Sequence, residues 1–240
     1  MNAIGVVAAL AAEARALGSA AGRMGDVGRL RNGSLVAVSG MGAAAAAAAA
    51  ARLIDNGASA LMSFGLAGGL DPALPAGSMV FPNEVISRDG RGFVTSMEWR
   101  DRLNTAVQGL GPVCAGKLLT SGRALDSVAE KAAAFRDTGA VAVDMESLAI
   151  AQVAAAHHLP FVAVRVVVDT AEDALPRAVL TASSSGQVRI WRLVGAIALA
   201  PAELGALIRL AGRYRTATRR LADVARAALP PRLGAHVRAA

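Results

Sequence analysis

The stretch from Gly139 to Asp173, GAVAVDMESLAIAQVAAAHHLPFVAVRVVVDTAED, decides the fold that we predict for this chain. Its runs AVAV and FVAVRVVV are apolar and β-branched, which favours buried strands, and ESLAIAQVAAA between them has helical spacing. Glu146 stands where the first strand gives way to the helix, and Asp169 stands where the second strand leaves the sheet. Ligands of α/β proteins collect at this edge, so both acids can face one pocket. A helix cap or a first-turn charge is the alternative for each acid.

The overall composition predicts one sizeable α/β domain. The chain has 240 residues, of which 54% are hydrophobic but only 3% aromatic, and the apolar excess is alanine and valine. Small apolar residues suit short helices that pack closely on a parallel type of sheet. We therefore expect a single domain over residues 1–240.

The charge is strongly basic and concentrated near the C-terminus. The formal net charge is +7, and after Asp173 eleven arginines face only two acids, Glu203 and Asp223. Apolar and arginine positions alternate there at helical spacing, which predicts a basic helical layer over residues 174–240. Such a layer either closes the fold with solvated arginines or lies on an anionic bilayer. Nucleic acid is not an expected partner, because aromatic residues that stack on bases are scarce.

The remaining global features predict a cytoplasmic protein, with membrane association through the basic helices as the further option. Cys114 is the single cysteine, so no intramolecular disulfide forms; we expect it to be a small core residue. Glu13 and Arg15 interrupt the first apolar run, which has no basic region before it, and this argues against a secretory signal. No apolar run reaches the roughly 18 residues of a spanning helix.

Two glycine-containing segments are candidates for ligand contact. Residues 34–58 predict a strand, a glycine turn and a long alanine helix that ends near Asn56 and Gly57. The helix start exposes amides to an anion, but its GxGxxA pattern lacks the complete dinucleotide fingerprint. Residues 60–86 predict a strand, a glycine-rich loop at Gly65–Gly69 and a further strand. Glycine permits close approach to a ligand, although a simple strand-end turn explains the glycines equally well.

Polar residues elsewhere in the central stretch have structural explanations. His157 and His158 are adjacent, so they face different sides of a helix and make a poor metal pair; no metal or cofactor is expected. Arg165 lies inside an apolar strand, where an unpaired charge is unfavourable. We expect a carboxylate partner for it, either Glu146 or Asp144.

The sequence VDMESLAIA, followed some twenty residues later by VRVVVD, resembles the signature motifs of the superfamily of purine nucleoside phosphorylases and methylthioadenosine/S-adenosylhomocysteine nucleosidases. The opening strand with Glu13 and the segment GLAGGLDPALPAGSMVF resemble the same family in the same order, so the resemblance covers approximately residues 3 to 173. It implies a three-layer α/β fold with a central mixed sheet flanked by helices, a homo-oligomer, and cleavage of an adenine nucleoside at its N-ribosidic bond.

The resemblance also implies a role for individual residues. Asp169 would serve the purine as a general acid, and Glu13 would orient the attacking water. Met145 and Glu146 would hold the ribose, and Leu125 would stack on the base. The other expected substrate-binding residues are Gly65, Leu66, Ala67, Gly68 and Arg165.

Several positions depart from the family pattern. Leu66 replaces a hydroxyl residue, and Ser63 and Phe64 stand where phosphorylases commonly carry an arginine. Val168 replaces the serine that steadies the catalytic acid, a task that Thr170 could take over. Whether phosphate or water attacks therefore stays open: Glu13 would repel phosphate, whereas the basic C-terminal part resembles the hopanoid-associated phosphorylase subgroup.

That subgroup resemblance implies adenosylhopane, a lipid-linked nucleoside, as substrate. A protein of a different class, which binds a nucleoside at the membrane surface without turnover, is the alternative.

Overall fold

The computed structural model describes residues 3–19, 24–175 and 204–230, and a mixed sheet of eleven strands forms its centre. The sheet is organised around the long strand β4 (Ala58–Gly69). Strand β11 (Phe161–Asp169) runs parallel to β4 along one edge. The other edge is shared by β1 (Ala3–Ala8), which is parallel, and β10 (Ala140–Asp144), which is antiparallel.

The shorter strands extend the sheet outward from these four. Beyond β1 and β10 lie β3 (Leu35–Val38), β2 (Val27–Arg29), β9 (Lys117–Thr120), β6 (Glu84–Ile86) and β7 (Gly92–Val94); beyond β11 lie β5 (Met79–Val80) and β8 (Val113–Cys114). The one further strand predicted after the glycine-rich segment within residues 60–86 is thus two strands, β5 and β6. Pro82 lies between them and has no amide to donate to a ladder.

The edge of β4 that β1 and β10 share contains a gap. The pairing with β1 ends at Ser63, and the pairing with β10 begins at Gly68. No described strand pairs with residues 64–67 on this edge, so their backbone amides there are available to side chains.

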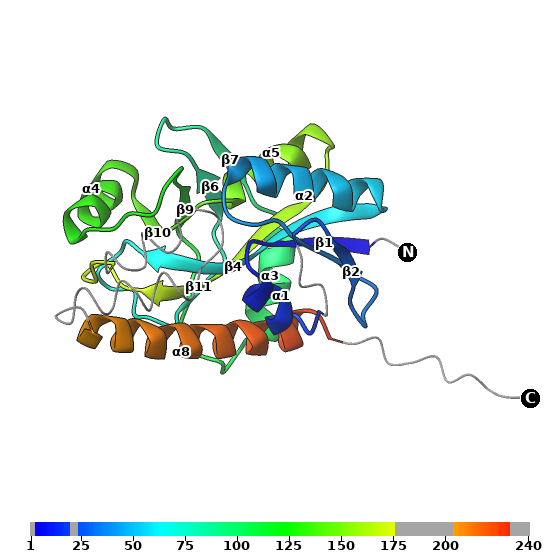
Figure 1. The fold of residues 1–240 in the computed structure, drawn as a ribbon. Helices are drawn as coiled ribbons and strands as arrows, with labels where there is room; N and C mark the ends of the chain where they lie inside the picture. The colour runs from blue at the N-terminus through cyan, green and yellow to red at the C-terminus, as the bar shows by residue number, and fades with distance from the viewer. Residues whose placement is uncertain (1–2, 20–23, 176–203, 231–240) are drawn as a thin grey trace, which may run out of the picture.

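Helices cover both faces of the sheet (Figure 1). One layer contains α2 (Ala43–Asp55) and α5 (Ser147–Ala156), and the opposite layer contains α1 (Ala11–Ala16), α3 (Met97–Ala106) and α8 (Leu204–Ala228), while α4 (Val128–Thr138) packs near β10. Two buried apolar clusters, one on each face, fill the space between the sheet and these layers. The protein therefore has the predicted three-layer α/β architecture.

Alanine allows α2 to lie close to the sheet and to α5. Ala46, Ala49, Ala50 and Leu53 are buried on one side of α2, where small side chains favour both helix formation and close packing. The helix ends at Asp55 with Asn56 as its C-cap, and Gly57 follows with a φ of 91°, which suits glycine. The predicted end of this helix is confirmed.

The predicted loop at Gly65–Gly69 is wrong, because β4 continues through all of these residues. The register with β11 places Arg165 opposite Gly65 and Asp169 opposite Gly68, and β10 pairs with Gly68 and Gly69. Strand β11 thus holds residues 65–68 extended, and β10 holds Gly68 and Gly69, despite the weak strand propensity of glycine.

The C-terminal part described by the structure consists mainly of one amphipathic helix. Helix α8 buries Ala217, Leu221, Val224 and Ala225 against the sheet, next to α1 and α3. The arginines predicted to be helical before residue 204 lie outside the described residues. Among the described helices, none combines the length and the apolar character needed to cross a membrane. Cys114 is half-buried and packs against the core.

Candidate functional site

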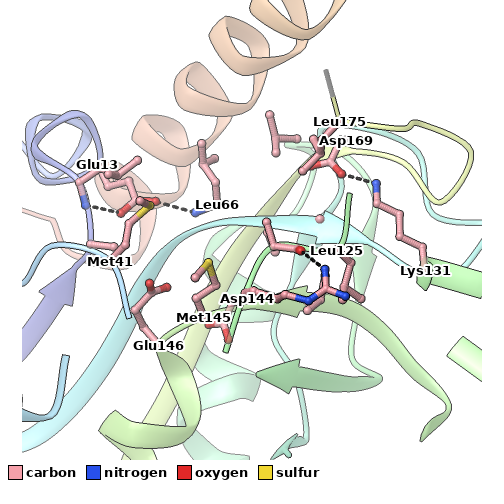
Figure 2. Close-up of a pocket in the computed structure, with 18 residues that line it drawn as sticks. Glu13, Met41, Leu66, Leu125, Lys131, Asp144, Met145, Glu146, Asp169 and Leu175 are labelled. Carbon is pink, nitrogen blue, oxygen red and sulfur yellow. Dashed lines mark hydrogen bonds and ion pairs between the residues drawn. The ribbon is translucent and has the colours of Figure 1, made fainter. Parts of the chain in front are cut away.

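A cavity of about 190 Å³ opens where the carboxyl ends of β1, β10 and β11 approach the gap in β4 (Figure 2). Eight of the ten predicted site residues line it: Glu13, Leu66, Ala67, Gly68, Leu125, Met145, Glu146 and Asp169. The other two, Gly65 and Arg165, lie outside its lining. The cavity therefore brings together residues that are up to 156 positions apart, from Glu13 to Asp169.

Glu13 takes the place of a strand partner in the gap of β4. Its Oε1 accepts the amide of Leu66 at 2.9 Å, and its Oε2 accepts the amide of Leu10 at 2.9 Å, before helix α1. The side chain is buried, so Glu13 is not a solvated charge at the start of α1. Burial raises the pKa of Glu13, although the Arg165 guanidinium and the two amides oppose the rise.

Glu146 stands at the N-cap position of α5, but its carboxylate does not cap that helix. Instead Oε1 accepts the amide of Gly42 at 2.8 Å, at the start of α2. The helix-start amide that the sequence offered to an anion therefore binds a carboxylate of the protein itself. Burial, together with the neighbouring Asp144 carboxylate, raises the pKa of Glu146 to about 7.

Asp169 ends β11 and forms a buried ion pair with Lys131 of α4 (Figure 2). Burial raises the pKa of Asp169, and the Lys131 ammonium opposes this rise. No described helix follows Asp169 directly, so a helix-cap role does not apply. Thr170 does not take the place of the missing serine, because its hydroxyl donates to Asp173 Oδ2 at 2.6 Å.

Sequence reasoning missed Lys131. The available signal was its spacing in the sequence: Ala134 follows three residues later, and in the structure both residues lie on the buried side of α4. A lysine on a buried helix face needs an acidic partner, and Asp169 is that partner. Met41, which also lines the cavity, was missed as well and had no distinguishing signal.

Asp144 lines the cavity and forms a buried ion pair with Arg165, which lies outside the lining. Arg165 Nε and Nη2 donate to Asp144 Oδ2 at 2.9 and 2.6 Å, and Nη2 also donates to the hydroxyls of Ser63 and Ser147 at 2.6 and 2.9 Å. Of the two partners expected for Arg165, Asp144 is the one it contacts. Arg165 is not among the residues that line the cavity, and its positive charge acts on Glu13 and Glu146 from outside the lining.

Gly65 separates these two charged groups. A Cβ built on Gly65 would lie 2.5 Å from both Arg165 Nη1 and Glu13 Oε1. The absence of a side chain thus allows the guanidinium and the carboxylate to approach the backbone of β4. Gly65 thus provides the space that these two side chains occupy, and it lies outside the cavity lining.

The cavity can stabilise positive charge and deliver a proton. Glu13, Glu146 and Asp169 are 4%, 7% and 5% exposed, and burial raises the pKa of all three carboxyls. Raised carboxyl pKa values at one cavity are typical of acid–base chemistry. Among the described residues, no group of three His, Cys, Asp or Glu side chains has the arrangement needed to hold a metal ion.

The sheet, its two helical layers and the carboxylate-lined cavity define an α/β protein with its site at the carboxyl ends of the central strands. The chain belongs to the phosphorylase superfamily, whose family model matches residues 3–197. No curated protein sequence matches the chain.

Solved structures with the same fold are distant in sequence. The 5′-methylthioadenosine/S-adenosylhomocysteine nucleosidase of Neisseria meningitidis, in complex with methylthio-immucillin-A, is 22% identical with a TM-score of 0.73, covering 95% of this chain and 98% of its own. Futalosine hydrolase of Helicobacter pylori is 14% identical with a TM-score of 0.72, covering 95% and 97%. At these identities the likeness establishes the shared fold.

Proposed function

We propose that the protein cleaves the N-ribosidic bond of an adenine nucleoside and releases adenine. The observation that carries the proposal is the convergence of three buried carboxyl groups with raised pKa values, Glu13, Glu146 and Asp169, on one cavity. Membership of the phosphorylase superfamily and the fold shared with nucleosidases support it.

The three carboxyl groups suit the charges that this reaction develops. Breaking the bond leaves positive charge on the sugar and negative charge on the departing base. Asp169 donates a proton or hydrogen bond to the five-membered ring of the purine, which makes adenine a better leaving group. Glu146 accepts ribose hydroxyls, Met145 lies against the sugar, and the ionised Glu146 favours the oxocarbenium-like state. Leu125 packs against the base.

Water is the nucleophile that the cavity favours. Glu13 has a raised pKa and therefore serves as a base that orients water, and its charge repels phosphate. The cations near the cavity are engaged: Lys131 pairs with Asp169, Arg123 pairs with Glu130, and Arg165 lies outside the lining. Among the described lining residues no cation is left for phosphate, so we propose hydrolysis rather than phosphorolysis.

The substituent beyond the ribose is proposed to be apolar. Leu66 and Leu175 line the side of the cavity along which α8 passes (Figure 2), and Leu10 also lines the cavity. This lining suits a thioether or a hydrocarbon better than a charged group. Adenosylhopane is the lipid-linked candidate, and methylthioadenosine is the compact one.

We also propose that α8 brings the protein to an anionic membrane surface, where a lipid-linked nucleoside would be found. Arg215 and Arg219 are exposed on α8, and Ile208 is an exposed apolar residue on the same helix. Exposed arginines beside apolar side chains favour the interface of an anionic bilayer. A homo-oligomer is proposed from family membership.

Adenine release with and without phosphate tests the proposed reaction. The wild-type protein should release adenine from methylthioadenosine or adenosylhopane at a rate independent of phosphate. Asp169→Asn should lower release by about 10²-fold, the scale of lost general-acid catalysis. Asp101→Asn, an exposed change on α3, is the matched control and should leave the rate unchanged.

Three outcomes would change the proposal. A strict requirement for phosphate would establish phosphorolysis, and near-normal release by Asp169→Asn would remove Asp169 from its role. Tight adenine binding without product from any nucleoside would favour the alternative of a binding protein without turnover.

A further inference from the structure

The ammonium group of Lys131 is the most completely enclosed charge near the cavity. Lys131 has no exposed surface, and its Nζ donates to Asp169 Oδ2, to the carbonyl of Thr170 at 2.8 Å and to the carbonyl of Asp173 at 2.9 Å. A lysine ammonium has three donors, and all three are used. The burial of this charge is therefore compensated in full, and the side chain has one available geometry.

Lys131 fixes one oxygen of Asp169 and leaves the other unengaged by it. The contact is made through Oδ2 alone. Both residues line the cavity, and Lys131 orients the Asp169 carboxyl group from another element, helix α4. The serine that the family places before the acid is Val168 in this chain. A charged side chain from another element thus occupies the supporting position.

Helix α8 contacts the turn over residues 170–173, whose carbonyl groups accept the hydrogen bonds of Lys131. Asp173 Oδ2 accepts the amide and hydroxyl of Thr170 at 2.8 and 2.6 Å, and it also pairs with Arg213 of α8. The carbonyl of the same Asp173 accepts Lys131. A continuous set of contacts therefore leads from Arg213 through Asp173 to Lys131 and Asp169.

We propose that Lys131 is the positioning residue of Asp169, and that Arg213 on α8 clamps the turn that holds Lys131. This inference rests on the proposed function, in which Asp169 is the general acid. Helix α8 thereby affects the reaction, because its contact with the turn helps to set the orientation of the Asp169 carboxyl group.

The charge of Lys131 also affects the pH at which Asp169 works. The ammonium opposes the rise that burial causes in the pKa of Asp169. The other charged groups around Asp169 are Arg209 and Arg213 of α8, Glu172 and Asp173 of the turn, Asp144 of β10, and Arg123 on the cavity wall. Without Lys131 the carboxyl would keep its proton to higher pH, but its orientation would be lost.

Two substitutions of Lys131 separate its charge from its geometry. Lys131→Met should lower kcat by about 10²-fold, the effect of a reacting group misplaced by about 1 Å, and should move the basic limb of the kcat/KM profile to higher pH. Lys131→Arg keeps the charge but not the shape, so kcat should fall while the basic limb stays near its wild-type pH. Wild-type kcat and an unmoved limb in Lys131→Met would overturn the proposal.

The clamp is tested on α8, where substitutions are tolerated better than in the core. Arg213→Met should lower kcat several-fold in the wild-type background and have no further effect in Lys131→Met, because both changes act through one turn. Arg226→Met removes an exposed pair with Asp223 on the same helix and is the matched control, with unchanged kcat. Equal effects of Arg213→Met in both backgrounds would refute the clamp.

A crystal structure of Lys131→Met separates this inference from the proposed function. If the wild-type protein releases no adenine, the proposed function fails, and the structure still decides the positioning role. A rotated Asp169 carboxylate with a displaced turn over residues 170–173 supports that role, and an unmoved carboxylate refutes it. Should Lys131→Met not fold, Lys131→Arg and Arg213→Met carry the test.

Discussion

Replacement of Glu146 by glutamine should make the protein more stable at neutral pH. In the folded protein Glu146 keeps its proton up to a pH of about 7, whereas in the unfolded chain it releases the proton near 4.5. Between these values the unfolded state binds fewer protons, so the free energy of unfolding falls as the pH rises. Below pH 4.5 Glu146 is protonated in both states, and the free energy of unfolding is not reduced. Above the folded pKa both states are ionised and the loss is complete.

The size of this effect follows from the pKa difference. One pKa unit corresponds to about 1.36 kcal/mol, so the interval from 4.5 to about 7 gives a loss of about 3 kcal/mol. Glutamine carries no charge at any pH and keeps an oxygen that can accept the amide of Gly42. Glu146→Gln should therefore avoid this loss.

Urea unfolding of the wild type and Glu146→Gln at intervals from pH 4.5 to pH 8 measures the difference. The gap between the two free energies should widen by about 3 kcal/mol over this range. Glu98→Gln, at an exposed position on α3, is the control and should show no such widening. Parallel curves for the wild type and Glu146→Gln would refute the argument from burial, and adenine release should be lost in Glu146→Gln under all conditions.

Two further predictions concern β4 and α8. Gly65→Ala should lower the free energy of unfolding in urea titrations by about 1–3 kcal/mol, because the new Cβ would lie 2.5 Å from Arg165 Nη1. The control Gly122→Ala places its Cβ in open space and should change the free energy of unfolding by less than about 0.5 kcal/mol. Equal stabilities of the two variants would contradict the crowding at β4. The double change Arg215→Gln with Arg219→Gln should lower co-sedimentation with vesicles that contain phosphatidylglycerol. Equal retention of the wild type on pure phosphatidylcholine vesicles would count against an electrostatic membrane contact.

Much of the fold follows from local sequence patterns. The valine runs that end in Asp144 and Asp169 predict β10 and β11, because short apolar β-branched runs favour buried strands. The alanine run predicts α2 and its end, since nothing in it opposes a helix. These patterns also place Glu146 and Asp169 at the edge of the sheet where the cavity lies.

The sequence does not predict the features that depend on distant partners. The extended form of Gly65–Gly69 is imposed by β10 and β11, which are remote in sequence, and local propensity favours a loop. The choice of Asp144 over Glu146 as partner of Arg165 depends on the antiparallel direction of β10, which single-sequence patterns do not reveal. The pairing of Lys131 with Asp169 likewise requires the placement of α4.

The number of residues in the segment of β4 that pairs with neither β1 nor β10, rather than their side chains, determines how the groups of the site are spaced. Four residues, 64–67, separate the end of the β1 ladder from the start of the β10 ladder. Because amides and side chains alternate in direction along a strand, inserting or deleting one residue here would turn the Leu66 amide away from Glu13. The same change would carry Asp144 out of register with Arg165. The number of residues in this segment of β4 thus fixes the spacing between Glu13 and the Arg165–Asp144 ion pair. Substitutions in the segment preserve that spacing, whereas the insertion of a single residue does not.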